Sequence, residues 1–261
     1  SQGVTGILAM GTTGESPTLN WQEHADVIDR VHQFIDGRCK TIAGTGSNST
    51  AESMEHTRHA VENGIGHILL VEPYYNGPSS IEIRREYMAP VAAEFPEAEI
   101  IPYVIPGRSG CQILPADVGI MAQELPNVNA VKEATGNLHN MRRTREVCGD
   151  DFAILSGDDP LTLTMMTDDA IACSGCISVW SNVAPGPVSK MVAAALAGDI
   201  DRADSINEAM QPLFDIVTVK TQEESPWGPR LCKARNPLPV KTFMRLLGMP
   251  VGPCRPPLGR M

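Results

Sequence analysis

The sequence predicts an α/β fold, a (β/α)8 TIM barrel that is followed by C-terminal helices. Short apolar runs rich in β-branched residues alternate with amphipathic helical patterns, and this alternation predicts a parallel sheet covered by helices. Six of the runs end in polar, glycine-rich turns. A barrel gathers all such turns on one face, whereas a doubly wound open sheet, the alternative, has a single crevice. We therefore favour the barrel, which also suits a chain of 261 residues.

Seven runs are expected to be strands because they are apolar and rich in β-branched side chains. They are residues 6–10, 40–45, 67–73, 99–105, 128–134, 152–157 and 176–180. Helix signals lie between them. Asn20 and Glu23 form a capping box at the start of one helix, and Ser49 and Glu52 form another. Asp159 is expected to be the N-cap of a further helix, because a proline follows it.

The last part of the chain is expected to be helical. The expected helices are residues 188–199, 202–220 and 239–248. We therefore assign residues 1–182 to the barrel, as its strands 2 to 8, and residues 183–261 to a C-terminal helical region. Because seven strands are counted instead of eight, we expect the first barrel strand to precede Ser1, and the C-terminal end to be trimmed as well.

Composition and charge argue against several classes of protein. The formal net charge is −10 and no block of five or six basic residues occurs, so nucleic-acid binding is not expected. No run of 18 apolar residues is present, so no membrane span is expected. The seven cysteines are odd in number and scattered, which is typical of a protein from the reducing cytoplasm.

No metal site is expected either. Cys173 and Cys176 form a single C-x-x-C within an apolar run. A zinc ribbon needs a second pair, and a redox pair needs a helix N-terminus, so we interpret these cysteines as structural. His56 and His59 could share a helical face, but no set of carboxylate ligands accompanies them, and a solvated helix face is the simpler interpretation.

Lys132 is the first candidate for chemistry, because it lies near the end of a buried strand in "NAVKEATGN". A free lysine amine has a pKa of about 10.4 and is a poor nucleophile at neutral pH. Loss of hydration at a strand end disfavours the charged form. A neutral amine can condense with a ketone to a Schiff base, which stabilises a carbanion. The alternative is an ion pair between Lys132 and Glu133 or another acid.

Two further segments carry candidate residues. Tyr103 lies in an otherwise apolar strand, where its hydroxyl could move protons beside the amine or could simply have a backbone partner. Arg108 follows in a proline–glycine loop and could bind a carboxylate in a bidentate fork. Thr12 and Thr13, in the turn "GTTGES", offer hydroxyl and N–H groups to an anion. No P-loop lysine follows this turn, so a carboxylate suits it better than a nucleotide.

Six motifs occur in a fixed order: "GTTGESPTL", "PYYNGPS", "Y-x-x-P-x-R-S-G", "KEATGN", "LSGDD" and "NPLPVK". In this order they closely resemble the dihydrodipicolinate synthase family of pyruvate-dependent class I aldolases and lyases, over essentially the whole chain. The resemblance implies a (β/α)8 barrel, commonly a homotetramer built as a dimer of dimers. It also implies the condensation of pyruvate with aspartate 4-semialdehyde to 4-hydroxy-tetrahydrodipicolinate, in lysine and diaminopimelate biosynthesis. No cofactor is implied beyond the covalent Schiff base with pyruvate.

The resemblance also implies the site residues. The catalytic residues would be Lys132, Tyr103, Thr13 and Tyr75, and the substrate-binding residues Thr12, Thr13, Arg108, Gly157 and Ile177. Lys132 would form the Schiff base and Tyr103 would act as general acid and base. Thr13 and Tyr75 would complete a proton relay, with Tyr75 reaching into the neighbouring subunit's site. The threonine pair would hold the pyruvate carboxylate, and Arg108 the carboxylate of the semialdehyde.

A regulatory lysine site at the dimer interface is a further implication of the resemblance. Its residues would be Ser16, Trp21, His24, Asn48, Glu52 and Tyr74. Glu52 is the natural partner for an ammonium group. Trp21 could instead serve only to pack the start of its helix.

One departure from the family and two other functions stay open. The family usually has asparagine after the catalytic tyrosine, where this chain has Val104, which we expect to point away from the barrel centre. A related lyase acting on N-acetylneuraminate or a keto-deoxy sugar acid is disfavoured by the "GTTGE" turn and Arg108. A non-catalytic amino-acid-binding barrel is disfavoured because a sensor has no need for a desolvated amine.

Overall fold

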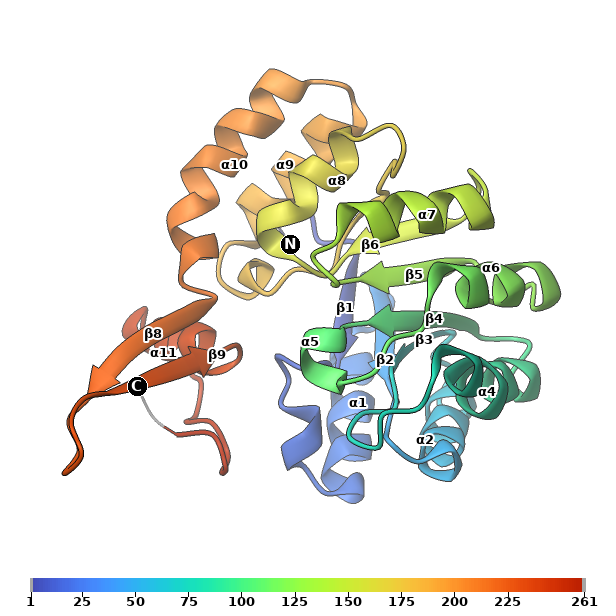
Figure 1. The fold of residues 1–261 in the computed structure, drawn as a ribbon, viewed down its shortest axis with the longest axis horizontal. Coiled ribbons are helices and arrows are strands. Elements are labelled where there is room, and N and C mark those ends of the chain that lie inside the picture. Colours follow the sequence, from blue (N-terminus) through green and yellow to red (C-terminus); the bar gives the residue numbers. More distant parts are fainter. Residues whose placement is uncertain (1, 260–261) are drawn as a thin grey trace.

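Seven parallel strands form the centre of the protein, whose computed structural model describes residues 2–259 (Figure 1). The strands are β1 (Gly6–Ala9), β2 (Lys40–Gly44), β3 (His67–Val71), β4 (Glu99–Val104), β5 (Ala130–Glu133), β6 (Ala153–Ser156) and β7 (Gly175–Cys176). They pair in sequence order, each parallel to the next. The sheet curls into a half-barrel, and β1 and β7 are its two edges.

Helices connect the strands and cover the outer face of the curled sheet (Figure 1). The α-helices are α1 (Trp21–Ile35), α2 (Thr50–Glu62), α3 (Ser80–Glu82), α4 (Ala89–Glu94), α5 (Pro106–Ser109), α6 (Pro115–Glu124), α7 (Leu138–Cys148), α8 (Thr162–Thr167), α9 (Pro185–Leu196), α10 (Ile200–Asp215) and α11 (Leu238–Leu246). Shorter 3-10 or π segments are η1 (Ser16–Thr18), η2 (Ile83–Met88), η3 (Asp159–Leu161) and η4 (Trp180–Asn182). No helix in the described chain is long and apolar enough to cross a membrane.

The capping box expected at α1 is confirmed, whereas at α2 only the N-cap bond of the expected box is present, since the Glu52 carboxylate accepts from the Ser47 hydroxyl instead. The Asn20 Oδ1 atom accepts from the Glu23 backbone N–H at 3.0 Å, and the Glu23 carboxylate accepts from the Asn20 N–H at 3.1 Å. The Ser49 hydroxyl accepts from the Glu52 N–H at 3.4 Å. Each bond satisfies a backbone donor that the first helical turn leaves without a partner.

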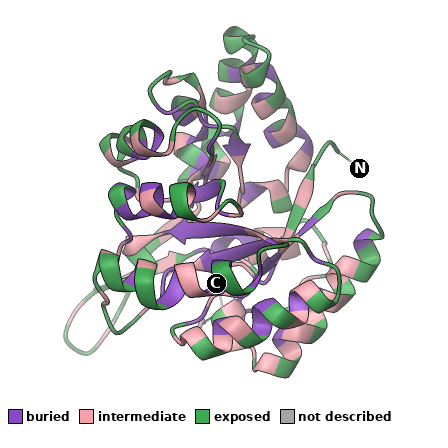
Figure 2. Cartoon of the chain, turned by 90° about the vertical axis from the view of Figure 1, so that its right-hand side faces the viewer, coloured by how far each residue is buried: buried purple, intermediate pink, exposed green. Residues whose placement is uncertain are grey.

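The main core lies between the outer face of the sheet and the surrounding helices, and the middle strands β3, β4 and β5 are almost wholly buried (Figure 2). Along β3, Ile68 and Leu70 belong to this outer core, while Leu69 packs in a smaller cluster inside the half-barrel. Tyr103 belongs to the inner cluster and Val104 to the outer core, so Val104 points away from the centre as expected. This alternation is what the two-residue period of a strand requires.

Two local expectations are wrong. Of the seventh expected strand, residues 176–180, only Cys176 pairs with β6, together with Gly175 before it, and Trp180 is instead fully buried beside Phe243. Asp159 does not cap its own helix, because its carboxylate accepts from the backbone N–H groups of Val179 and Trp180, at 2.9 and 3.0 Å. In both cases a tertiary contact replaces the local pattern.

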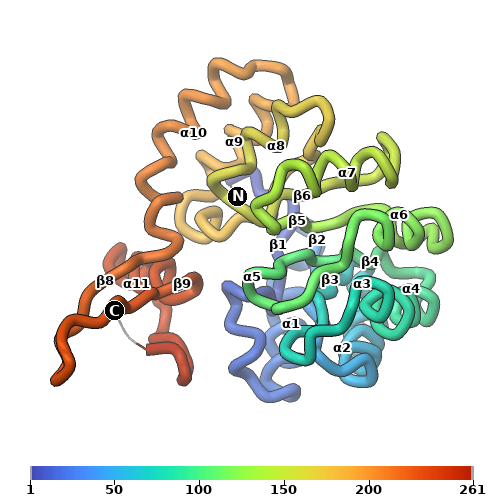
Figure 3. Tube along the Cα trace, in the orientation of Figure 1, coloured from blue at the N-terminus to red at the C-terminus, as the bar shows by residue number. Residues whose placement is uncertain are grey.

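The C-terminal region also differs from the expected run of helices. The helix predicted at 202–220 ends at Asp215, and β8 (Thr218–Glu223) follows and pairs antiparallel with β9 (Arg230–Arg235). Figure 3 traces this hairpin away from the half-barrel, beside α11. In this hairpin the apolar side chains of Val219 and Ala234 lie opposite each other. Residues 218–220 of the predicted helix therefore belong to a strand.

Candidate active site

The carboxyl ends of the parallel strands place the expected site residues around one groove inside the half-barrel. Thr12 and Thr13 come from the turn after β1, Tyr103 from β4 and Lys132 from β5. Arg108, Gly157 and Ile177 also line this groove, after β4, β6 and β7. Lys132 and Tyr103 are direct partners in the register of β4 and β5, which explains why the two side chains lie together.

Lys132 is buried, with 6% of its surface exposed, and its Nζ atom lies 4.0 Å from the centre of the Tyr103 ring. Burial lowers the pKa of the amine to about 8; Asp159 and Cys176 act in the opposite direction, and Arg108 adds to the lowering. The alternative of an ion pair with Glu133 is not supported. The Glu133 carboxylate accepts from the Thr135 N–H at 2.8 Å and from the Asn140 amide at 3.3 Å instead. A useful fraction of the amine is therefore neutral near neutral pH.

Gly157 explains how a long amine fits at this position. A Cβ atom at Gly157 would lie 3.0 Å from the Lys132 Cε atom and 2.9 Å from the Ala134 Cβ atom. Both distances are shorter than side-chain packing normally allows. The missing side chain after β6 thus leaves room for the lysine chain.

The Tyr103 hydroxyl is protonated at neutral pH. Burial raises the pKa of Tyr103 to about 12, while Arg108 and the Thr12 side chain act in the opposite direction. Only 5% of the residue is exposed. A protonated phenol beside a neutral amine can donate a proton to a nearby alkoxide and recover it afterwards.

Asn236 is a site residue that sequence reasoning missed. Its side-chain amide donates to the Thr13 Oγ1 atom at 2.9 Å, and its backbone carbonyl accepts from the Arg108 guanidinium at 2.8 Å. The residue is 6% exposed and its side-chain oxygen has no hydrogen-bond partner. Asn236 is the first residue of "NPLPVK", one of the six motifs that carry the family resemblance.

Arg108 lies at the rim of the groove in the short helix α5. Burial lowers the pKa of the Arg108 guanidinium, and the positive charge of the nearby Arg235 lowers this pKa further. The interaction with Tyr103 acts in the opposite direction. No ion pair joins Arg108 to an acid within residues 2–259. A guanidinium without an acidic partner can bind a substrate carboxylate.

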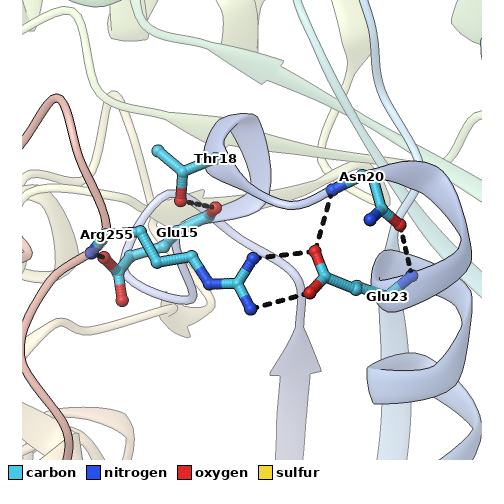
Figure 4. Close-up of polar contacts among 5 residues, drawn as sticks. All are labelled: Glu15, Thr18, Asn20, Glu23 and Arg255. Carbon is cyan, nitrogen blue, oxygen red and sulfur yellow. Dashed lines mark hydrogen bonds and ion pairs between the residues drawn. The ribbon is translucent and has the colours of Figure 1, made fainter.

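The turn that carries Thr12 and Thr13 is held from the C-terminal side of the chain. Glu15, which follows the turn, is 8% exposed and forms an ion pair with Lys241. Its second oxygen accepts from the Arg255 backbone N–H at 2.8 Å. Figure 4 shows that the Arg255 guanidinium also grips both oxygens of Glu23, at 2.7 and 2.8 Å. Segments more than 200 residues apart in sequence therefore fix this turn.

Tyr75 is the one expected catalytic residue that does not line the groove. It is 88% exposed, and its backbone has the left-handed φ of 86°. Its backbone N–H donates to the Ser109 carbonyl at 3.1 Å, so the side chain lies outside the chain's own site.

The residues expected to bind regulatory lysine gather at a second place, near the start of α1. The Ser16 hydroxyl lies 3.1 Å from the His24 Nε2 atom, and the Trp21 ring stacks on His56 at 3.6 Å between centroids. Burial lowers the pKa of His24 to about 4 and also lowers that of His56. His56 was expected on a solvated helix face and not in this group, but only 6% of it is exposed. The expected members of this group also include Asn48, Glu52 and Tyr74.

Glu52 and Tyr74 both form a hydrogen bond with Ser47. The Ser47 hydroxyl donates to the Glu52 carboxylate at 2.5 Å. Burial raises the pKa of Tyr74, as does the Glu52 charge, while a hydrogen bond with Ser47 lowers it. Asn48, between the two serines of this loop, is exposed.

Within residues 2–259 no three His, Cys, Asp or Glu side chains are placed to hold a metal ion. The seven cysteines are all free. The Cys173 thiol donates to the Gly175 carbonyl at 3.1 Å, and burial raises the pKa of Cys176 to about 12.

Comparison with known proteins gives matches over the whole chain. The model of the Dihydrodipicolinate synthetase family matches residues 1–261. The 4-hydroxy-tetrahydrodipicolinate synthase of Methanococcus maripaludis is 39% identical over 259 residues, which are 99% of this chain and 82% of that protein. The crystal structure of dihydrodipicolinate synthase from Aquifex aeolicus is 39% identical, with a TM-score of 0.88 over 100% of this chain and 82% of the other. DHDPS from Cyanidioschyzon merolae with lysine bound is 34% identical, with a TM-score of 0.88 over 100% and 82% of the two chains.

Proposed function

The chain belongs to the dihydrodipicolinate synthetase family, and on that premise we propose how its residues perform the family's reaction. It is a lyase-class enzyme, a 4-hydroxy-tetrahydrodipicolinate synthase, that condenses pyruvate with aspartate 4-semialdehyde through a lysine Schiff base. The observation that carries the mechanism is the buried Lys132 amine, with a pKa of about 8, beside the Tyr103 ring.

Lys132 begins the reaction as a neutral amine. Its Nζ atom attacks the ketone carbon of pyruvate, and loss of water leaves a protonated imine. The imine withdraws electrons, so the pyruvate methyl group loses a proton and an enamine forms. Because the imine itself accepts the electron pair, no metal or organic cofactor enters any of these steps.

Tyr103 acts in the step that forms the carbon–carbon bond. The enamine carbon attacks the aldehyde carbon of the second substrate, and the Tyr103 hydroxyl donates its proton to the alkoxide that forms. The amino group of the semialdehyde then attacks the imine carbon, closes the ring and expels Lys132 as an amine. The sum of the steps is one product, 4-hydroxy-tetrahydrodipicolinate, and one water.

The remaining site residues bind the two substrates. Thr12 and Thr13 hold the pyruvate carboxylate, and the Asn236 amide fixes the Thr13 hydroxyl. Arg108 binds the carboxylate of aspartate semialdehyde, which its lack of an acidic partner supports. Gly157 and Ile177 shape the pocket around the imine.

The assembly is a homotetramer, a dimer of dimers, in which Tyr75 works in the neighbouring subunit. An 88% exposed tyrosine close to the Arg108 turn supports this arrangement. Thr13 and the neighbour's tyrosine then complete a proton relay to Tyr103. The regulatory residues Ser16, Trp21, His24, Asn48, Glu52 and Tyr74 bind lysine at the same interface, with the Glu52 carboxylate receiving the ammonium group.

The complete fold is a (β/α)8 barrel. The two edge strands β1 and β7 leave unpaired backbone groups, and Ile7 on β1 is 40% exposed. An eighth strand between them satisfies these groups and covers this side chain. Residues 1–182 form the barrel region and 183–261 the C-terminal region that closes over the turn of Thr12. The free cysteines support the cytoplasm as the compartment.

A substrate comparison tests the proposed function. Purified enzyme is supplied with pyruvate and either aspartate semialdehyde, N-acetylmannosamine or a sugar-derived aldehyde, and consumption of pyruvate is followed. We expect turnover with aspartate semialdehyde and less than about one hundredth of that rate with the others, because only this aldehyde offers a carboxylate to Arg108. Preferred turnover of a sugar aldehyde would contradict the assignment.

A further inference from the structure

Glu72 is a buried acid that the reaction does not use. It follows β3 directly, and none of its surface is exposed. No Lys, Arg or His of the described chain forms an ion pair with it. Burying a carboxylate without a cation costs free energy. Such a group persists where the surrounding structure needs its hydrogen bonds.

Three hydrogen bonds attach the loop after β4 to this carboxylate. The Oε2 atom accepts from the Ile105 backbone N–H and from the Ser109 hydroxyl, each at 2.8 Å. The Oε1 atom accepts from the Ile113 backbone N–H, also at 2.8 Å. The loop of residues 105–113 thus wraps around one side chain, and Arg108 lies within that loop.

The same contacts tie the loop after β3 to the loop after β4. The Glu72 backbone N–H donates to the Tyr103 carbonyl at 3.3 Å, and the Tyr75 N–H donates to the Ser109 carbonyl at 3.1 Å. The Cys111 thiol donates to the Pro73 carbonyl at 3.3 Å. A change at Glu72 therefore reaches both the Arg108 turn and the backbone of the exposed tyrosine.

We propose that Glu72 is a positioning residue for the second substrate: its ionised carboxylate holds the loop of residues 105–113 so that Arg108 faces the groove, and protonation of Glu72 loosens that loop. This inference rests on the proposed function, in which Arg108 binds the carboxylate of aspartate semialdehyde. Lys132 lies on a different strand, so formation of the pyruvate imine does not depend on Glu72.

Protonation of Glu72 falls in an accessible pH range. Burial raises the pKa of Glu72 to about 7, and the negative charge of Glu133 also raises it. The hydrogen bonds from Ile105, Ile113 and Ser109 act in the opposite direction. The ionisable groups that interact with its charge are Glu133 from β5, Tyr103 from β4 and Cys111 after α5.

A protonated carboxyl group cannot keep all three bonds in their present direction and strength. Its O–H is a donor, and the Ile105 and Ile113 N–H groups cannot accept from it. The Ser109 hydroxyl can turn round and accept, since it also lies 2.9 Å from the Cys111 carbonyl, to which it can then donate. The Ile105 N–H is left with a weakened acceptor on the same oxygen, and the Arg108 turn becomes less ordered.

The test compares the wild-type enzyme with Glu72→Gln and with Asp117→Asn as a matched control. Asp117 is also a buried acid, 7% exposed, but it pairs with Arg84 and does not line the groove. At saturating pyruvate, kcat/KM for aspartate semialdehyde is measured between pH 6 and 9. Lys132 is then held as the imine, so its own titration does not enter the profile.

For the wild type we expect kcat/KM for aspartate semialdehyde to fall by about tenfold from pH 8 to pH 6, with an apparent pKa near 7. Glu72→Gln should raise KM for the semialdehyde by roughly tenfold at pH 8, which is the effect of one lost charge-assisted hydrogen bond. It should also abolish the acid limb, that is, the fall of kcat/KM between pH 8 and pH 6. KM for pyruvate should change by less than about twofold. Asp117→Asn should keep both the limb and KM, whatever its melting temperature.

Ser109→Ala provides a second variant, because Glu72→Gln could prevent folding. Removing the hydroxyl takes away a bond that lowers the pKa of Glu72, so the acid limb should move to higher pH. A purely structural serine would leave the limb where it is. An unmoved limb in Ser109→Ala, or an unchanged KM and acid limb in Glu72→Gln, overturns the proposal.

Trapping of the pyruvate adduct separates this inference from the proposed function. Borohydride reduction with pyruvate should label Lys132 in Glu72→Gln as fully as in the wild type. A labelled variant with unchanged kinetics for the semialdehyde contradicts only the role of Glu72. Absence of the label in the wild type contradicts the proposed function itself.

Discussion

The rate of imine formation should follow the titration of Lys132. Burial lowers the pKa of this amine from 10.5 to about 8. At pH 7 about a tenth of the amine is then neutral, against about one part in 3,000 for an unshifted lysine, which is a gain of roughly 300-fold in nucleophile. We therefore expect the rate of imine formation to rise by about 50-fold between pH 6 and 8 and to level off above pH 9.

The assay for this prediction is a single-turnover experiment. Enzyme and excess pyruvate are mixed at each pH, quenched with borohydride at set times, and the reduced adduct is counted by intact-protein mass spectrometry. Lys241, which is paired with Glu15 outside the groove, serves as an internal control that should stay unlabelled. A rate that keeps rising tenfold per pH unit up to pH 10 would refute the reasoning, because it would belong to a hydrated amine.

Three other changes test neighbouring parts of the site. Gly157→Ala should slow imine formation by at least tenfold, because the new Cβ would lie 3.0 Å from the Lys132 Cε atom. The circular dichroism spectrum should stay unchanged. A normal rate would show that the Lys132 side chain can adopt another conformation that still reaches pyruvate. Tyr103→Phe should still form the adduct but lose about 100-fold or more in steady-state turnover, since it lacks the proton donor; full turnover would remove Tyr103 from the mechanism. Glu15→Gln should lower the free energy of unfolding by about 1 to 3 kcal/mol in thermal or urea melts, because it replaces the buried Glu15 carboxylate and leaves the half-buried Lys241 amine without its charge partner. An unchanged melting curve would mean that the contact between Glu15 and the C-terminal segment does not stabilise the fold.

Lys132 should also make stability depend on pH. Its folded pKa lies below its unfolded value, so the unfolded chain binds more protons between about pH 8 and 10.5. The free energy of unfolding should therefore gain about 3 kcal/mol from this group as pH rises through that range, relative to Lys132→Met.

The strand pattern and the strand-end residues could be predicted because local signals are strong there. Buried parallel strands must be continuously apolar, so a lysine or tyrosine within them stands out against its neighbours. Once β4 and β5 are known to be adjacent parallel strands, Tyr103 and Lys132 are expected near each other, and their register confirms this.

The residues that were missed act through tertiary contacts. Glu72 looks like an ordinary polar residue at the end of "HILLVEP", and its burial depends on the loop that comes 33 to 41 residues later. Asn236 contacts Thr13 across 223 positions. The predicted helix at 202–220 extends into the first three residues of β8, and the antiparallel pairing of these residues with β9, such as Val219 with Ala234, depends on a segment more than ten residues later in the chain.

The most direct test of the account is the chemical identity of the trapped adduct. Native enzyme is reduced with borohydride in the presence of pyruvate, digested and mapped by mass spectrometry. The account predicts one pyruvate-derived modification per chain, on Lys132, and its loss in Lys132→Met. An adduct on any other lysine, or none at all in an enzyme that still consumes pyruvate and aspartate semialdehyde, would contradict it.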